Sequence, residues 1–214
     1  MFLLKNWRNL GNKTFTHFIF IACLYVFFLY GYAHAETKPI GINAKFPDLT
    51  FHDILSKEEQ VYVGISGNTG FSFKKIPGTL FVFEVFSTYC ASCPKNVPIL
   101  NNVYSGIENN SKLKKKAKVI GIAIGNNQKE VESFKKEYKV QYPVLTDFNF
   151  ASHKALGNPR VPYTIIVRRD ARGKGIVVNT HQGIIDSAEN IMDKIRDFIQ
   201  CDPSLLKKKK ALSK

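Results

Sequence analysis

The sequence predicts an α/β domain in which a central sheet of mixed strand direction is flanked by helices. From residue 79 onward, strand-like apolar runs alternate with amphipathic helical segments, a pattern typical of strands connected by helices. The last two strand-like segments are separated only by a glycine-containing turn at residues 171–175, which indicates an antiparallel hairpin. Strands linked by helices, followed by a hairpin and a closing helix, favour a mixed sheet.

The first 35 residues have the features of an export signal. Three basic residues and no acidic one accompany an apolar run at residues 18–32, and an Ala-x-Ala site ends at Ala35. This order is typical of a secretory signal peptide. We therefore expect an exported protein, periplasmic or otherwise extracytoplasmic, whose mature chain begins at Glu36. An uncleaved membrane anchor is the alternative, because the run approaches the ~20 residues of a spanning helix.

The chain is strongly basic, with 31 lysines and arginines against 17 acidic residues and a formal net charge of +14. Loss of the three basic residues in the signal segment would lower this charge to +11. A positive surplus can attract anionic membranes or nucleic acid. No nucleic-acid motif accompanies the scattered lysines, so we expect no nucleic-acid partner. In the basic tail, residues 201–214, a weak contact with a membrane surface is expected through Lys207, Lys208, Lys209 and Lys210.

Residues 36–78 form an irregular extension that we expect to pack on the main domain, residues 79–200. Short strand-like pieces occur at residues 46–51 and 61–65, and glycines mark the turns that follow. The extension is therefore predicted to hold little regular structure of its own.

The segment from Thr79 to Phe86 is the clearest strand of the main domain. Its residues are almost all apolar, which suits a strand buried on both faces. Further strands are expected at residues 118–124, 144–146, 163–168 and 176–181. Helical segments are expected at residues 94–109, 128–139, 152–156 and 188–199. A proline inside the first of these helices, Pro98, predicts a kink.

Cys90 and Cys93 directly follow this strand and open the next helix. Positions i and i+3 lie on one face of a helical turn, ~5–6 Å apart, which is close enough for a disulfide. The free N–H groups and positive dipole of a helix N-terminus would stabilise a thiolate at Cys90, and the thiolate is the attacking species in disulfide exchange. We predict Cys90 as nucleophile and Cys93 as resolving thiol, with no cofactor, because the cysteines carry the redox equivalents.

Other roles for the cysteine pair are weaker predictions from the same residues. A structural zinc site needs about four ligands, and Cys201 and the scattered histidines supply no second cluster. A purely structural disulfide between Cys90 and Cys93 would close a very small loop and constrain the unfolded chain little. Cys201 itself is interpreted as an inert thiol near the end of the chain, with a dimer-linking or resolving role as the alternative.

The segment FVFEVFSTYCASCPKNVPILNNVY, from Phe81 to Tyr104, resembles the active-site segment of thioredoxin-like proteins. It is most similar to the extracytoplasmic TlpA/ResA group, in which an aromatic-Cys-x-x-Cys-Pro element follows a strand. The resemblance extends from about Gly41 to Phe198 and implies a thioredoxin-like fold. It also implies disulfide exchange with exported proteins, including cytochrome-maturation partners, as a reductant supplied by an upstream membrane electron donor. Tyr89 stands where family members usually have tryptophan.

Glu84, six residues before Cys90, matches the position of a buried acid that handles the proton of the resolving thiol in thioredoxins. In the sequence it is an acidic residue within an apolar strand. Burial without a partner would raise its pKa and suit it to proton exchange. A strand-edge glutamate that points to water is the alternative.

The Val161-Pro162 pair matches the cis-proline that opens the strand facing the cysteines in this fold. The resemblance implies that Val161 and Pro162 form a substrate-docking wall, with Tyr89 beside the attacking sulfur. His181, near the end of a predicted strand, is interpreted as structural.

Two rival functions share parts of this pattern. A thioredoxin-fold thiol peroxidase would have a Thr-x-x-Cys nucleophile, a spacing that Thr88-Tyr89-Cys90 does not supply. A non-enzymatic copper carrier would use a more widely spaced cysteine pair and a histidine, and no histidine lies near this pair in sequence. The sequence therefore favours a thiol–disulfide oxidoreductase over both.

Overall fold

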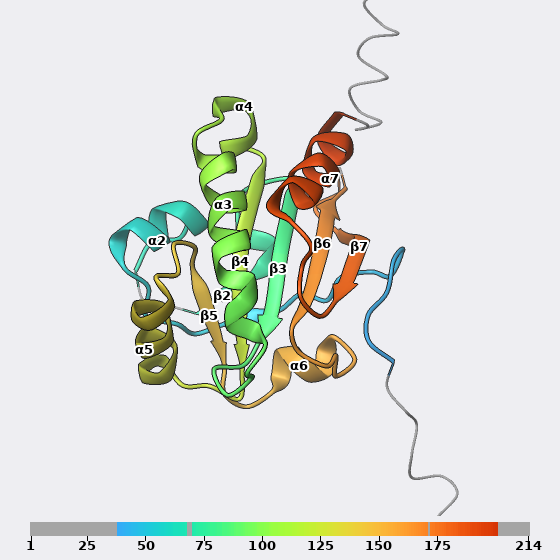
Figure 1. The fold of residues 1–214 in the computed structure, drawn as a ribbon. Helices are drawn as coiled ribbons and strands as arrows, with labels where there is room; N and C mark the ends of the chain where they lie inside the picture. Colours follow the sequence, from blue (N-terminus) through green and yellow to red (C-terminus); the bar gives the residue numbers. More distant parts are fainter. Residues whose placement is uncertain (1–37, 68–69, 171, 201–214) are drawn as a thin grey trace, which may run out of the picture. The chain divides into compact units, whose positions relative to one another are not determined.

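A computed structural model describes residues 38–67, 70–170 and 172–200 of the chain (Figure 1). The expected signal segment, the basic tail and Cys201 lie outside these residues. Within the described ranges, no helix combines the length and apolarity required to cross a membrane.

Five strands form the central sheet in the order β5-β4-β3-β6-β7. β3, β4 and β5 run parallel to one another, whereas β6 and β7 are antiparallel to their neighbours. The strands are β3 (Leu80–Phe86), β4 (Ala117–Ile124), β5 (Val144–Asp147), β6 (Tyr163–Arg169) and β7 (Gly175–Gln182). The predicted mixed sheet is confirmed. Because parallel strands end at the same edge of a sheet, the segments that follow β3, β4 and β5 meet at one edge (Figure 1).

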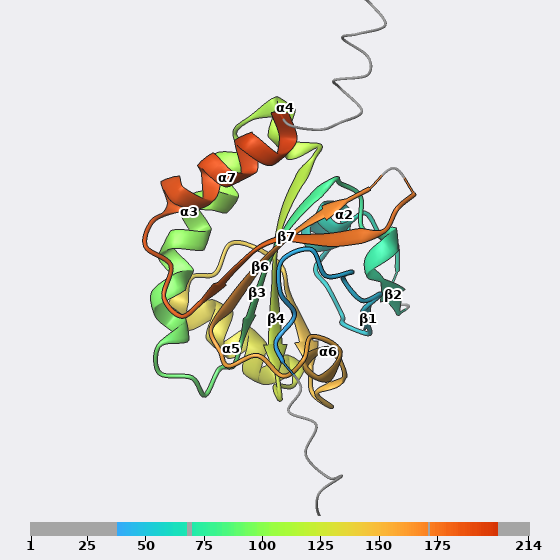
Figure 2. The ribbon, with the colours of Figure 1, turned by 90° about the vertical axis from the view of Figure 1, so that its right-hand side faces the viewer.

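Helices cover one face of this sheet, and the N-terminal extension covers the other. Figure 2 shows α3 (Val97–Glu108) and α7 (Ala188–Gln200) on one side and α2 (Lys57–Val63) on the other. The remaining elements are β1 (Thr50–Phe51), β2 (Phe71–Ser72), the 3₁₀ turns η1 (Phe73–Lys75) and η2 (Cys93–Asn96), and the helices α4 (Ser111–Lys114), α5 (Gln128–Tyr138) and α6 (Ala151–Ala155). β1 and β2 pair with each other as a separate two-stranded sheet.

The side chains of β3 alternate between two hydrophobic clusters, as the period of two in a strand requires. Phe81, Phe83 and Val85 belong to the cluster on the extension side, which we call the extension-side cluster. Leu80, Val82 and Phe86 belong to the cluster beneath α3, α5 and α7, the helix-side cluster. All seven β3 residues are buried, so the sheet's central strand is covered on both faces as its apolar sequence predicts.

The prediction of a strand at residues 61–65 is wrong, because Val61 to Val63 form the end of helix α2. Ser56 caps this helix, and Ser56 and Glu59 exchange the two hydrogen bonds of a capping box. Gly64 ends the helix in the left-handed conformation that favours glycine. The local capping signal therefore outweighs the β-branched residues. Of the piece expected at residues 46–51, only Thr50 and Phe51 form a strand.

The helix expected at residues 94–109 begins differently from the prediction. The chain first makes the 3₁₀ turn η2, and the α-helix starts only at Val97. Pro98 has no N–H to donate to the carbonyl of Pro94, and that carbonyl instead accepts from the N–H of Val97. Pro98 thus lies in the first turn of α3, where a proline is tolerated, and marks a change of helix type in place of the predicted kink.

Candidate active site

Cys90 and Cys93 lie just beyond the carboxyl end of β3 and form a disulfide with Cα atoms 5.4 Å apart. The backbone N–H of Cys93 donates to the carbonyl of Cys90, which turns the chain into η2. Cys93 is buried at 3% exposure, whereas Cys90 is partly exposed. This difference supports the predicted roles, since an attacking sulfur must be reached by a partner and a resolving sulfur benefits from shielding.

The Cys90 sulfur has three close polar neighbours in the described chain. The N–H of Cys93 donates to it at 3.2 Å, and the Ser92 hydroxyl lies at 3.5 Å. The third neighbour is the carbonyl oxygen of Val161, 3.9 Å away. None of these groups is cationic, and the two that can stabilise a thiolate here are a backbone N–H and a hydroxyl.

The Val161–Pro162 peptide bond is cis, and it brings the Val161 carbonyl against the cysteine pair. β7 holds this segment in place, because the side-chain amide of Gln182 donates to the carbonyls of Arg160 and Pro162 at 2.8 and 3.0 Å. The N–H of Gly183 also donates to the Pro162 carbonyl, at 2.9 Å. The cis-proline and the disulfide therefore face each other as the resemblance implies.

Glu84 is 2% exposed and lies on the helix side of β3, so the alternative of a water-facing glutamate is wrong. Its Oε1 accepts from the Nδ2 of Asn96 and its Oε2 from the hydroxyl of Thr164, both at 2.7 Å. Burial raises the pKa of Glu84 to about 7, although the two hydrogen bonds act in the opposite direction. At that pKa the carboxyl can both take up and release a proton near neutral pH.

Asn96 and Thr164 are site residues that the sequence analysis missed. Both are almost fully buried, and each is a polar residue at an apolar position of its element. Such a residue needs a hydrogen-bonding partner inside the protein, which is the signal that was available in the sequence. In η2, Cys93 and Asn96 are three residues apart, and side chains at this spacing in a 3₁₀ turn eclipse each other. The turn therefore directs Cys93 toward the side on which Asn96 contacts Glu84.

The segment between β3 and Cys90 is fastened to the end of β4 by Asn126, which is completely buried. Its Oδ1 accepts from the N–H of Thr88 at 2.9 Å, and its Nδ2 donates to the Thr88 hydroxyl at 2.6 Å. Tyr89 is 73% exposed, and its hydroxyl donates to Glu130 of α5. The aromatic side chain beside Cys90 is thus both open to solvent and tethered to a neighbouring helix.

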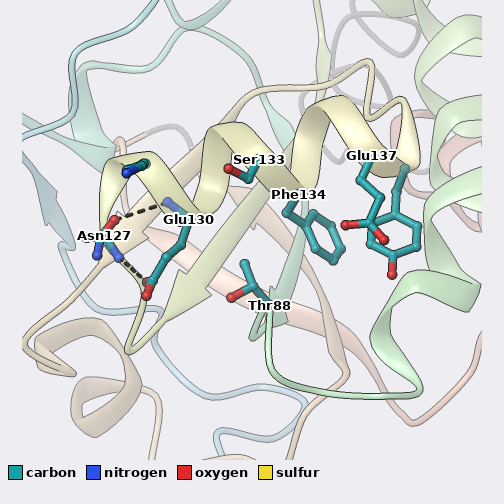
Figure 3. A pocket seen from close by; sticks show the side chains of 8 residues that line it. Thr88, Asn127, Glu130, Ser133, Phe134 and Glu137 are labelled. Carbon is teal, nitrogen blue, oxygen red and sulfur yellow. Dashed lines mark hydrogen bonds between the residues drawn. The ribbon is translucent and has the colours of Figure 1, made fainter.

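A groove of about 470 Å³ runs between this segment and α5. Figure 3 shows Thr88 on one side and Glu130 and Phe134 on the other, with Glu130 hydrogen-bonded to Asn127. The hydrogen bonds from the Tyr89 hydroxyl and the Asn127 N–H lower the pKa of Glu130. Glu130, which was not predicted as a site residue, therefore carries a negative charge at the rim of the active-site segment.

Among the described residues, no group of three or more His, Cys, Asp or Glu side chains is placed to hold a metal ion. Cys90 and Cys93 therefore have no third ligand of these types beside them in this part of the chain.

A cysteine pair after the central strand of this sheet, opposite a cis-proline, defines the chain as a thiol–disulfide oxidoreductase of thioredoxin-like fold. Residues 42–195 match the family model described as Redoxin, and the chain belongs to that family. The family, the fold and the enzyme class predicted from the sequence are confirmed.

Individual relatives are similar over most of their length. The chain is 19% identical over 177 residues to the thiol-disulfide oxidoreductase ResA of Geobacillus thermodenitrificans, covering 83% of this chain and 91% of the relative. A putative protein disulfide isomerase from Bacteroides thetaiotaomicron shares the fold with a TM-score of 0.57, at 14% identity over 78% of this chain and 95% of that one. The thioredoxin domain of a thiol-disulfide oxidoreductase from Bacteroides vulgatus gives a TM-score of 0.55, at 13% identity over 73% and 99%.

Proposed function

We propose that this enzyme is exported and reduces disulfides in extracytoplasmic proteins through Cys90 and Cys93. The observation that carries the proposal is the arrangement of the pair. A partly exposed Cys90 sulfur faces the cis-proline segment, while Cys93 and the acid Glu84 are buried behind it. In this arrangement the partly exposed Cys90 sulfur can attack a disulfide of a protein substrate, and the buried Cys93 sulfur can then release the substrate from Cys90.

The proposed reaction is a two-step exchange. The Cys90 thiolate attacks one sulfur of the substrate disulfide, the substrate S–S bond breaks, and a mixed disulfide forms while the other substrate sulfur leaves as a thiolate that takes up a proton. The sulfur of Cys93 then attacks Cys90, the mixed disulfide breaks, and the second substrate sulfur leaves. The substrate gains two electrons and two protons, and the enzyme ends with the Cys90–Cys93 disulfide seen in the structure.

Glu84 serves the second step as proton acceptor. Cys93 must lose its proton to become the attacking thiolate, and its burial at 3% exposure keeps bulk water from taking that proton. Glu84 is buried on the side to which η2 directs Cys93, and its pKa of about 7 lets it hold the proton and pass it on. Substrate docking is assigned to Val161 and Pro162 opposite the sulfur and to the exposed ring of Tyr89.

The surroundings of Cys90 support the reducing direction. A strongly oxidising pair has a stabilised reduced form, in which the attacking thiolate is held by favourable charges or donors. Here the sulfur receives one backbone N–H and lies near one hydroxyl, with no cationic neighbour in the described chain. The dithiol therefore gives up its electrons readily.

Export and partners rest on the sequence and on similarity. Residues 1–35 have the pattern of a signal peptide, and the segment around Cys90 and Cys93 resembles that of the extracytoplasmic TlpA/ResA group. The substrates are exported proteins that carry disulfides, cytochrome-maturation partners among them, and a membrane electron donor returns the pair to the dithiol. Lys207 to Lys210, within the basic tail, are assigned a weak contact with the membrane surface.

Equilibration of the mature protein with graded thiol buffers tests the direction. A reduction potential of about −270 mV supports a reductant, and a value of about −120 mV would contradict it. Trapping tests the substrate class: a Cys93→Ala variant produced with its signal segment should hold exported proteins in mixed disulfides, and a matched Cys90→Ala variant should hold none. Failure of Cys93→Ala to hold any exported protein would reject the proposed substrates.

A further inference from the structure

We infer that Asn96 is a positioning residue that links the Glu84 carboxyl to the cis-proline docking wall, so that substrate docking and proton transfer depend on one side chain. The inference rests on the proposed function, because it assigns a task to the Glu84 and Pro162 of that mechanism. Asn96 is 1% exposed and lies in η2, one turn beyond Cys93.

The orientation of the Asn96 amide follows from its partners. Its Oδ1 accepts from the backbone N–H of Ile185 at 2.9 Å, and an N–H can only donate. The Nδ2 group must therefore point to the other side, where it donates to Glu84 Oε1 at 2.7 Å and to the carbonyl of Gly183 at 3.2 Å. Every hydrogen-bonding atom of this buried amide is used, and two of its three bonds reach the segment between β7 and α7.

That segment is in turn bonded to the docking wall. Gly183 accepts from Asn96 through its carbonyl and donates through its N–H to the carbonyl of Pro162, at 2.9 Å. Gly183 is thus the single residue that connects Asn96 to the cis-proline Pro162 through hydrogen bonds. The carbonyl oxygen of Val161, the residue before Pro162, lies 3.9 Å from the Cys90 sulfur. A displacement of the wall by substrate is transmitted to the Asn96 amide and hence to Glu84.

Asn96 has few competitors for control of Glu84. The neighbouring strands place Gly121 and Thr164 beside it, and α3 and α7 contribute apolar side chains to the surrounding cluster. Tyr142, from the segment before β5, interacts electrostatically with Glu84, and Cys93 lies in the same helix-side cluster as Tyr142. Donation from Asn96 favours the ionised carboxyl, which is the form able to accept the Cys93 proton.

Four variants separate the two halves of this link. Thr164→Val removes the other donor to Glu84 and leaves the loop untouched, whereas Gln182→Ala loosens the docking wall and leaves Glu84 untouched. Asn96→Ala breaks both halves. Asn96→Asp keeps an acceptor for Ile185 but replaces the donor to Glu84, and its near-identical shape provides a second test if Asn96→Ala fails to fold.

Two readouts are used on each reduced, folded variant. The first is the pH midpoint of the resolving step, followed with a small aromatic disulfide that releases one coloured thiolate when Cys90 attacks and a second when Cys93 resolves the adduct. The second is the KM for oxidised insulin as a protein probe. Asn96→Ala, Asn96→Asp and Thr164→Val should raise the midpoint by about one pH unit or more. Asn96→Ala and Gln182→Ala should raise KM several-fold, and Thr164→Val should not.

The outcomes distinguish this inference from the proposed function. If Asn96→Ala raises the midpoint but leaves KM at the wild-type value, the link to the docking wall is overturned. If neither Asn96 variant moves the midpoint while Glu84→Gln abolishes it, Asn96 has no positioning role and the role of Glu84 stands. If Glu84→Gln itself leaves the midpoint in place, the proposed proton transfer fails, and the inference fails with it.

Discussion

The two faces of β3 have different interiors, although both are buried. On the extension side, Phe81 and Phe83 pack among rings from the N-terminal extension, and Phe46 stacks on Phe83 with ring centroids 4.9 Å apart. On the helix side, the same strand places Glu84 between Asn96 and Thr164. One face is built from aromatic packing and the other includes a hydrogen-bonded polar cluster beneath the reactive pair.

This difference separates stability from chemistry. Aromatic side chains bury large apolar areas and add favourable ring contacts, so the extension-side cluster contributes mainly to the free energy of folding. A buried carboxyl costs free energy unless its oxygens find partners, so the polar set of Glu84, Asn96 and Thr164 is retained at some expense of stability. Successive side chains of a strand point to opposite faces, so Phe83 contributes to folding stability on one face and Glu84 to the chemistry on the other.

Buried carboxyls lie on both sides of the sheet, and two of them, Asp53 and Glu84, differ in their partners. Asp53, which lies between Phe51 and Leu55 of the extension-side cluster, is 4% exposed. Its Oδ1 accepts from the N–H of Thr146 at 2.7 Å, but its Oδ2 has no partner. Burial raises the pKa of both carboxyls, yet only Glu84 is next to the cysteine turn. A raised pKa by itself therefore does not identify the proton-transfer group.

The largest expected effect is the loss of disulfide exchange in a Cys90 variant whose stability is unchanged. Cys90→Ser should abolish disulfide exchange, because a hydroxyl at this position cannot form the mixed disulfide. The free energy of unfolding, compared with that of the reduced wild-type protein in denaturant titrations, should stay within about 0.5 kcal/mol. A large loss of stability in this variant would mean that the active-site face is also essential for folding, and the proposed division between the faces would be wrong.

The opposite result is expected from Phe83→Ala on the extension side. Removal of this fully buried ring, which contacts the rings of Phe46 and Phe73, should lower the free energy of unfolding by about 3–5 kcal/mol. At a temperature where the variant is folded, its exchange rate should remain near that of the wild type. Urea unfolding and the exchange assay on the same sample check both halves of the prediction.

Glu84→Gln should sharpen the comparison through pH. The folded-state pKa of about 7 lies above the ordinary value of 4.5, so the folded protein binds more protons than the unfolded chain in that window. The stability of the oxidised wild-type protein should therefore fall as pH rises from 4.5 to 7, by about 3 kcal/mol. The glutamine variant should lack this fall and should resolve the mixed disulfide slowly. Parallel pH slopes for the two proteins would contradict the prediction.

The smallest effect is expected from Asp53→Asn, the matched control on the other face. Its amide oxygen keeps the bond from the Thr146 N–H, and loss of the ionisable group should change stability at neutral pH by about 1 kcal/mol or less. Because its folded pKa is raised, the wild type should lose stability relative to the variant as pH rises. The exchange rate and its pH profile should not change; a shifted profile would show that the two carboxyls are coupled.

Much of the fold was predictable because its signals are local. The apolar run of β3 and the spacing of Cys90 and Cys93 were sufficient to place a reactive pair at the end of a buried strand. Helix α2 was missed although its capping box, Ser56 with Glu59, is also a local signal. The apolar residues at the end of that helix, Val61 to Val63, favour a strand when they are judged by residue type alone.

The partners of Glu84 could not be predicted in the same way. Asn96 is 12 residues from Glu84 in sequence and Thr164 is 80, and no periodicity connects positions on three different elements. The sequence indicated only that an acid lies in an apolar strand. The identity of its donors depends on how β6 and η2 pack against β3, which is a property of the folded chain.

The sequence by itself determined the class of sheet, the reactive cysteine pair and the acid on the strand before it, because hydrophobic period and residue spacing act over a few residues. The tertiary structure decided which groups surround that pair. It set the cis-proline segment against Cys90, bonded Asn96 to Glu84 and to the docking wall, and tethered Tyr89 to α5. Those contacts join residues far apart in the chain, and only the packing of the sheet and its helices brings them within hydrogen-bonding distance.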